Sequence, residues 1–325
     1  MRRSLVLVAI FAAAVILDAA QPRSGALLVL NKDDATLAIV DPATGAIRGT
    51  VPVGQAPHEL VTSDDGTWAF ASNYGTGPAP GHTISMIDVA AKKELRRIDV
   101  SPLQRPHGLA FAGGKLYFTA EANKTIARYD PATNQIDWTF ETGQNTTHMV
   151  RIAKDLKTIF TANIGSDSIS AIERDAAGNW RQTVIGVGKG PEGNALTPDG
   201  KQLWAANSRD GSVSIVDVAS KKVTGTIDIG TKRSNRIAFT RDGKLALVSD
   251  DDTGELAVID VAGRTVTKRI PLGKNAEGIV IAPDGAQAFV AVNGDNVVAV
   301  VDLKTWQVTK RIATGKGPDG MAWVQ

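Results

Sequence analysis

Short runs of alternating apolar and polar residues, separated by turn sequences, recur along the chain. The stretch 188–217 shows one such unit, and it predicts strands at Asn194–Thr197, Gln202–Ala206 and Ser212–Val216. A Pro-Asp-Gly triplet separates the first two strands. Alternation bounded by Gly, Pro, Asn and Asp is typical of β-strands joined by hairpin turns. The pattern therefore predicts an all-β protein.

Each unit closes on a carboxylate, and these acidic residues are evenly spaced. They are Asp41, Asp88, Asp130, Glu173, Asp217, Asp260 and Asp302, so successive positions differ by 47, 42, 43, 44, 43 and 42 residues. A period near 42 residues with four strands per repeat is typical of one blade of a β-propeller. Seven repeats predict a seven-bladed β-propeller of four-stranded antiparallel blades, filling residues 25–325 as a single domain.

The two ends of this predicted propeller complement each other. The chain after residue 25 begins with the second strand of a blade, whereas the segment 318–325 supplies an innermost strand. If the N-terminal strands and the C-terminal strand share one blade, the ring closes and leaves no open sheet edge.

The second strand of each unit carries a related sequence. It reads FASN at 70–73, FTAN at 160–163 and WAAN at 204–207, and a strand such as SVSIVD follows at 212–217. These segments resemble the bacterial YVTN-repeat β-propellers, and the resemblance extends over essentially all of residues 25–325. It implies the propeller fold. Related propellers include lactonase-like enzymes, quinoprotein heavy subunits and plain binding proteins, so the resemblance leaves the activity open.

The N-terminus has the features of an export signal. A basic segment at 1–4 precedes thirteen apolar residues, Leu5–Leu17, and small residues follow at Ala19 and Ala20. Because about 20 apolar residues are needed to span a bilayer, residues 1–24 are interpreted as a secretory signal peptide. The mature protein is then expected to be periplasmic or secreted, without a transmembrane segment, and monomeric.

Composition narrows the possible partners and cofactors. The chain has no cysteine, which excludes disulfides, thiolate metal sites, a cysteine-linked lipid and covalent c-type haem. Its formal net charge is +2 and no long basic run occurs, so nucleic-acid binding is not expected. The partners expected are a small-molecule ligand or a periplasmic protein.

One column of the aligned repeats concentrates candidate chemistry. It opens the first strand of each unit, where the strands of a propeller line the central channel, and it contains His58, His107, His148, Glu192, Asn235, Glu277 and Asp319. Three of the four histidines of the chain fall in this column. Because consecutive blades are neighbours, these three imidazoles are expected to form one arc.

Three converging imidazoles form a typical site for Zn, Cu, Ni or Fe. Glu192, from the next blade, is expected to be a fourth ligand or a general base. Asn235, Glu277 and Asp319 form an oxygen-rich arc that suits Ca, Mg or a polar ligand. Plain channel lining, with hydrated or paired side chains and no ligand, is the alternative interpretation.

A second column ends the second strand of each unit, and it should reach the same mouth of the channel. It contains Asn31, Asn73, Glu121, Asn163, Asn207, Asp250 and Asn293. The Asn residues of this column usually bond turn backbone, so a structural role is expected for them. The extra loop Gly75–His82 brings the fourth histidine to this face, as an outer ligand or as part of an exposed loop.

Three functions remain open from the sequence. The first is a binding protein for a small ligand or transition metal at the His58/His107/His148 arc. The second is a metal-assisted lactonase- or lyase-like enzyme in which Glu192, Glu277 or His148 transfers the proton. The third is an interaction platform for a periplasmic partner.

Overall fold

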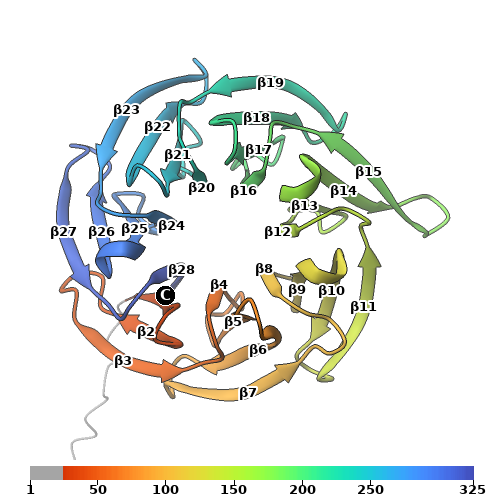
Figure 1. The fold of residues 1–325 in the computed structure, drawn as a ribbon, viewed down its shortest axis with the longest axis horizontal. Coiled ribbons are helices and arrows are strands. Elements are labelled where there is room, and N and C mark those ends of the chain that lie inside the picture. Colours follow the sequence, from red (N-terminus) through yellow and green to blue (C-terminus); the bar gives the residue numbers. More distant parts are fainter. Residues whose placement is uncertain (1–24) are drawn as a thin grey trace, which may run out of the picture.

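The computed structural model describes residues 25–325, which form seven four-stranded antiparallel sheets around a central axis (Figure 1). The predicted seven-bladed propeller is therefore confirmed. The predicted signal peptide, 1–24, lies outside the described residues. Within residues 25–325 no helix is long and apolar enough to cross a bilayer.

The strands form four concentric layers. The innermost strands are β4 (Pro57–Thr62), β8 (Pro106–Ala112), β12 (Thr147–Ile152), β16 (Pro191–Leu196), β20 (Ser234–Phe239), β24 (Ala276–Ile281) and β28 (Pro318–Val324). The second strands are β1 (Ala26–Asn31), β5 (Trp68–Gly75), β9 (Lys115–Ala120), β13 (Thr158–Asn163), β17 (Gln202–Asn207), β21 (Leu245–Asp250) and β25 (Gln287–Val292).

The third strands are β2 (Thr36–Val40), β6 (Pro80–Asp88), β10 (Thr125–Asp130), β14 (Ser168–Arg174), β18 (Ser212–Asp217), β22 (Glu255–Asp260) and β26 (Val297–Asp302). The outer strands are β3 (Ile47–Pro52), β7 (Lys93–Asp99), β11 (Gln135–Glu141), β15 (Trp180–Gly186), β19 (Lys222–Asp228), β23 (Thr265–Pro271) and β27 (Val308–Ala313). Three 3₁₀ turns follow second strands: η1 (Glu121–Asn123), η2 (Ile164–Ser166) and η3 (Asn293–Asp295).

The ring closes through a blade that both ends of the described chain share. Its strand order is β28-β1-β2-β3, and Leu28 of β1 pairs with Ala322 of β28. One hydrophobic cluster packs this blade against β4–β7 and another packs it against β24–β27. The predicted closure is therefore confirmed, and it leaves the middle strands of this blade, β1 and β2, paired on both sides.

Hydrophobic burial occurs mainly between adjacent blades. Trp204 of β17 and Ile215 of β18, for example, share a cluster with Ile237 and Val248 of the following blade. Strand β13 is buried at every position, whereas the outer strand β11 alternates between exposed and half-buried residues. Neighbouring blades cover both faces of the middle strands, so these strands are buried along their length, polar Ser and Thr positions included, and only the outer layer alternates in exposure.

The Asn residues that end the second strands are structural, as expected from turn chemistry. The Asn73 Oδ1 atom accepts a hydrogen bond from the Gly54 backbone amide at 3.0 Å. Asn163 donates from Nδ2 to the hydroxyls of Ser168 and Ser170 at 3.2 and 3.0 Å. These bonds tie the strand ends to neighbouring turns and place the loops of the mouth.

Asn194 is a buried polar residue in an otherwise apolar column. It is fully buried on β16, and neither atom of its amide has a hydrogen-bond partner among residues 25–325. The equivalent positions of the other blades are Leu60, Leu109, Val150, Ile237, Ile279 and Met321. Leucine has a similar volume and no unsatisfied polar atom.

The Asn194→Leu variant is therefore expected to raise the free energy of unfolding by about 1–2 kcal/mol, measured by urea denaturation. Asn163→Leu is the matched control, because Asn163 is equally buried but hydrogen-bonded, and this variant should be destabilised. A loss of stability in Asn194→Leu would contradict the prediction.

Candidate functional site at the channel mouth

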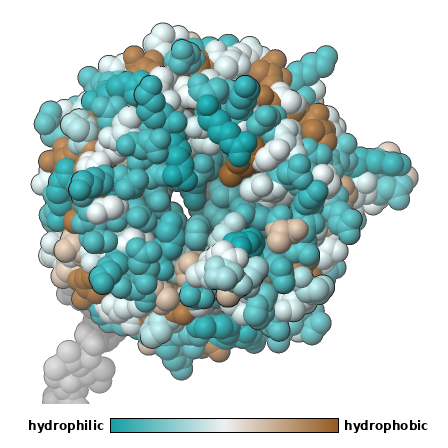
Figure 2. All heavy atoms as spheres, viewed as in Figure 1, coloured by the Kyte–Doolittle hydropathy of each residue, from teal (hydrophilic) through white to brown (hydrophobic). Residues whose placement is uncertain are grey.

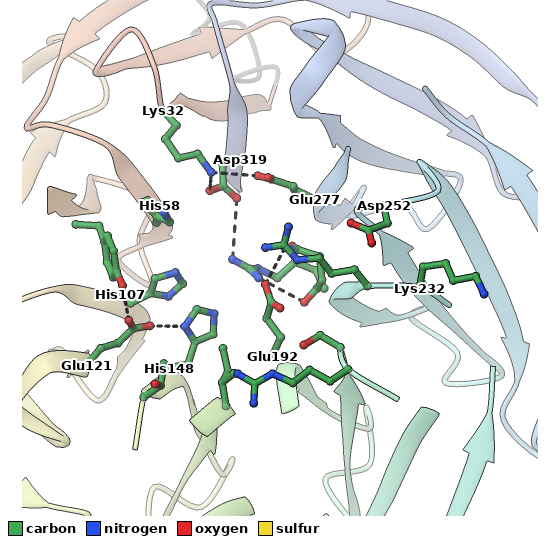
Figure 3. A pocket seen from close by; sticks show the side chains of 18 residues that line it. Lys32, His58, His107, Glu121, His148, Glu192, Lys232, Asp252, Glu277 and Asp319 are labelled. Atoms are coloured by element: carbon green, nitrogen blue, oxygen red, sulfur yellow. Dashed lines mark hydrogen bonds and ion pairs between the residues drawn. The ribbon is translucent and has the colours of Figure 1, made fainter. Parts of the chain in front are cut away.

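All seven residues of the first-strand column line one cavity of about 590 Å³ at the mouth of the channel. A largely hydrophilic surface surrounds the central hollow (Figure 2). The side chains point towards the axis from the starts of the inner strands, which brings residues up to 261 positions apart, His58 and Asp319, into one site (Figure 3). The cavity has two chemically different sides.

The first side is an imidazole arc made of His58, His107 and His148. The His107 and His148 rings stack with centroids 3.7 Å apart and an interplanar angle of 30°. The His58 ring lies 5.2 Å from the His107 ring, edge to face. Consecutive blades therefore place the three rings together, as the sequence predicted for this column.

Hydrogen bonds fix the tautomers of two of these rings. His58 Nδ1 lies 2.8 Å from the Ala56 carbonyl oxygen, and His148 Nδ1 is hydrogen-bonded to Glu121 Oε1. A carbonyl or carboxylate oxygen can only accept, so both Nδ1 atoms carry the proton. In the neutral rings each Nε2 atom is then left with a lone pair. His148 Nε2 is buried and has no partner among the described residues, and the same holds for His107 Nδ1.

Glu121 and Tyr74 extend this arc. The Tyr74 hydroxyl donates to Glu121 Oε2 at 2.6 Å, while the other carboxylate oxygen, Oε1, accepts a hydrogen bond from His148 Nδ1. His107, Glu121 and His148 form a group in which the potential metal-ligand atoms all lie within 4.8 Å of one another. The sequence pattern placed Glu121 at this mouth but did not include it among the candidate ligands. The available signal was that it is the one glutamate in a column otherwise made of Asn and Asp.

The electrostatics of the arc favour neutral rings at His58 and His107 and a charged carboxylate at Glu121. Burial lowers the pKa of His107 well below its usual value, and the neighbouring His148 and His58 lower it further. Burial also lowers the pKa of His58, against the opposing effect of Asp319. For Glu121, burial would raise the pKa, but the charge and hydrogen bond of His148 outweigh it and hold the pKa below its usual value.

The second side of the cavity is a polar wall, defined here as Lys32, Glu192, Asn235, Arg236, Glu277 and Asp319. Lys32 Nζ donates to Asp319 Oδ2 at 3.2 Å and lies 3.7 Å from Glu277 Oε2. Asn235 donates to Glu192 Oε1 at 3.0 Å. Arg236 is ion-paired with Glu59 across the channel. The first-strand column of the sequence predicted the three acids of this wall and Asn235 as site residues. It did not predict the two cations, Lys32 and Arg236.

Glu277 and Asp319 are two buried carboxyl groups of which only one is protonated. Burial and the adjacent Asp319 carboxylate raise the pKa of Glu277 to about 9. For Asp319, burial would raise the pKa, but Lys32, His58 and Arg236 together hold it below its usual value. Like charges this close cannot both ionise, so Asp319 carries the charge and Glu277 the proton.

Glu277→Gln is expected to gain stability relative to the wild type as the pH rises from 4.5 to about 9. Over this window the wild-type carboxyl binds a proton in the folded state but not in the unfolded state, so wild-type stability falls as the pH rises. Glutamine does not titrate and removes that slope. Urea unfolding of both proteins across the window tests this, and a difference that does not change with pH would contradict it.

Two predicted site residues have other surroundings. Glu192 lines the cavity but is hydrogen-bonded to Asn235, and the carboxylate that meets the imidazoles is Glu121. His82 lies exposed on β6, near Asp99 of β7, and is not part of the cavity lining. The strand pairing that places Thr83 opposite Asp99 carries His82 towards the outer strand, away from the axis.

The fold and the site define a β-propeller with a polar, histidine-containing cavity at its channel mouth. The chain belongs to the YNCE-like beta-propeller family, whose model matches residues 110–287, more than half of the sequence. No curated protein sequence matched the chain.

Solved structures share the fold at low sequence identity. The hydrazine synthase of Kuenenia stuttgartiensis is 22% identical, with a TM-score of 0.70 over 81% of this chain and 88% of that chain. A "putative 6-phosphogluconolactonase" from Bacteroides uniformis is 16% identical, with a TM-score of 0.75 over 93% and 100%. A Lactobacillus plantarum protein is 15% identical, with a TM-score of 0.78 over 93% and 99%. These likenesses concern the fold.

Proposed function

We propose that this protein is an exported β-propeller that binds one divalent transition metal ion at the channel mouth, through His58, His107 and His148. The observation that carries the proposal is the pair of buried imidazole nitrogens, His148 Nε2 and His107 Nδ1, that have no partner among the described residues. A buried polar atom without a partner is costly, and a ligand at these nitrogens would remove that cost.

The chemistry of the arc suits Zn, Cu, Ni or Fe, which accept neutral imidazole nitrogen. The lowered pKa of His58 and of His107 keeps both rings neutral at pH 7, as ligation requires. Glu121 uses both carboxylate oxygens, on His148 and Tyr74, so its role is to orient the His148 ring from outside the coordination shell. A position facing the cavity would stay open to a further ligand.

Export rests on the signal-like sequence at 1–24, and it places the protein in the periplasm or outside the cell.

The experiment that tests the function is elemental analysis of untagged mature protein purified without chelator, followed by titration of the metal-free protein with Zn, Cu, Ni and Fe. About one equivalent of metal is expected. Absence of metal after reconstitution would contradict the proposal and favour a metal-free ligand or a protein partner.

A metal-assisted lactonase-like hydrolase is the second candidate, and Glu277 favours it. Its raised pKa keeps a proton on a carboxyl group that shares the cavity with the imidazole arc. A metal would polarise an ester carbonyl, and a protonated carboxyl is a suitable general acid. The Bacteroides uniformis neighbour described as a 6-phosphogluconolactonase makes lactones the first substrates to screen. Turnover that is lost in Glu277→Gln but not in His82→Ala would support this candidate.

A further inference from the structure

The polar wall has unused hydrogen-bonding capacity. Asn235 is 5% exposed and Asp319 2% exposed, and the Oδ1 atom of each is buried without a hydrogen-bond partner among residues 25–325. Arg236 Nη2 lies 4.0 Å from Asp319 Oδ1, beyond hydrogen-bond distance. Both residues line the cavity, so two unpaired acceptors lie in the wall of a space large enough for a ligand.

The polar wall is also close to neutral, which limits the ligand that it can take. Its cations, Lys32 and Arg236, are ion-paired with the carboxylates of Asp319 and Glu59, while Glu277 holds a proton. Donors and acceptors therefore alternate with little net charge, and neither a polyanion nor a polyamine is favoured. A hydroxyl group both donates and accepts, so it can satisfy such a wall without bringing charge into the cavity.

The size of the cavity gives the third constraint. About 590 Å³ lies within the range of pockets for small organic molecules and is far more than one metal ion occupies. We propose that the polar wall binds the hydroxyl groups of a small polyhydroxylated compound, of the size of a monosaccharide. The inference deepens the proposed function and rests on it, because the same cavity places this ligand beside the imidazole arc.

Isothermal titration calorimetry of the mature protein, metal-free and Zn-loaded, with three related compounds tests the inference. D-glucose carries ring hydroxyls, D-glucuronate adds a carboxylate, and cyclohexanecarboxylate keeps ring and carboxylate without hydroxyls. Both sugars are expected to bind with a Kd of about 1 mM or lower, whereas no binding of cyclohexanecarboxylate is expected. Tighter binding of D-glucuronate would show that the metal or the exposed rim cations, Arg209, Lys232 and Arg233, hold the carboxylate.

Two cavity variants and one control locate the binding. Asn235→Ala and Glu192→Ala are each expected to weaken sugar binding by about tenfold, the effect of one lost hydrogen bond in a buried site. Asn179→Ala is the matched control, because Asn179 is exposed and outside the cavity lining, and its affinity should equal that of the wild type. Melting curves for each variant verify folding, and Glu192, which is only half-buried, tolerates truncation better than Asn235.

Three results would overturn the inference: no binding of either sugar, equal binding of cyclohexanecarboxylate, or sugar binding that both cavity variants leave unchanged. The outcome is separable from that of the metal proposal. Stoichiometric metal without sugar binding removes only this inference. Sugar binding by a protein that takes up no metal removes only the metal site.

Discussion

Replacing Arg236 by methionine is expected to lower the free energy of unfolding by about 3–5 kcal/mol. Arg236 is 8% exposed and ion-paired with Glu59, which lies 177 residues away on β4. The carboxylates of Glu59, Asp319 and Glu192 raise its pKa in spite of burial. Methionine fills the volume but leaves the buried Asp319 and the half-buried Glu59 and Glu192 without their shared cation.

Urea denaturation at neutral pH measures this effect, and Arg97→Met is the matched control. Arg97 makes two hydrogen bonds of 2.9 Å to Glu94, but the pair lies on the exposed outer strand β7. Solvent screens such pairs, so the control should lose no more than about 1 kcal/mol. Similar small losses in both variants would show that the pair across the channel is not a buried, coupled interaction.

Replacing His107 and His148 together by alanine is expected to abolish metal binding, with a loss of affinity of more than about a hundredfold. Each ring offers a buried nitrogen that has no partner within the described chain, so the double variant removes two nitrogen ligands at once. Replacing a single outer partner of a ligand already weakens metal affinity by about 10–100-fold, and the loss of two direct ligands exceeds that. Competition with a chelator of known affinity measures the effect.

Two further variants calibrate this result. Glu121→Gln keeps the shape of the side chain but removes the charge beside His148, so an intermediate loss of about 10–100-fold is expected. His82→Ala removes the one histidine outside the cavity and should leave metal affinity unchanged. A double variant that still binds one equivalent as tightly as the wild type would exclude the imidazole arc as the metal site.

The repeat in the sequence was sufficient to predict the fold. Period, turn residues and alternation recur in every blade, and the interactions that fix a blade are local hairpins and contacts between consecutive repeats. The prediction that both ends share one blade followed from the number of strands expected at each end. The position of the seven channel residues followed from the same alignment, because equivalent positions of a ring meet at its axis.

Which side chains of the ring contact one another could be learned only from the tertiary structure. The sequence predicted Glu192 as the fourth ligand because its blade is next in order, whereas Glu121, on the turn after a second strand, bonds His148 in the adjacent blade. Lys32 and Arg236 lie outside the two columns that the alignment singled out, and they become site residues only when the ring closes. His82 shares the chemistry of the arc but not its place, because it lies exposed on β6, a third strand that pairs with the outer strand β7.

The sequence by itself thus determined the architecture and the ring of side chains at the axis, because both depend on a period that is written along the chain. The tertiary structure decided which of these groups touch, which proton each holds and which atoms lack a partner. Those properties depend on distances of a few ångströms between blades far apart in sequence, and on burial, which no local pattern encodes.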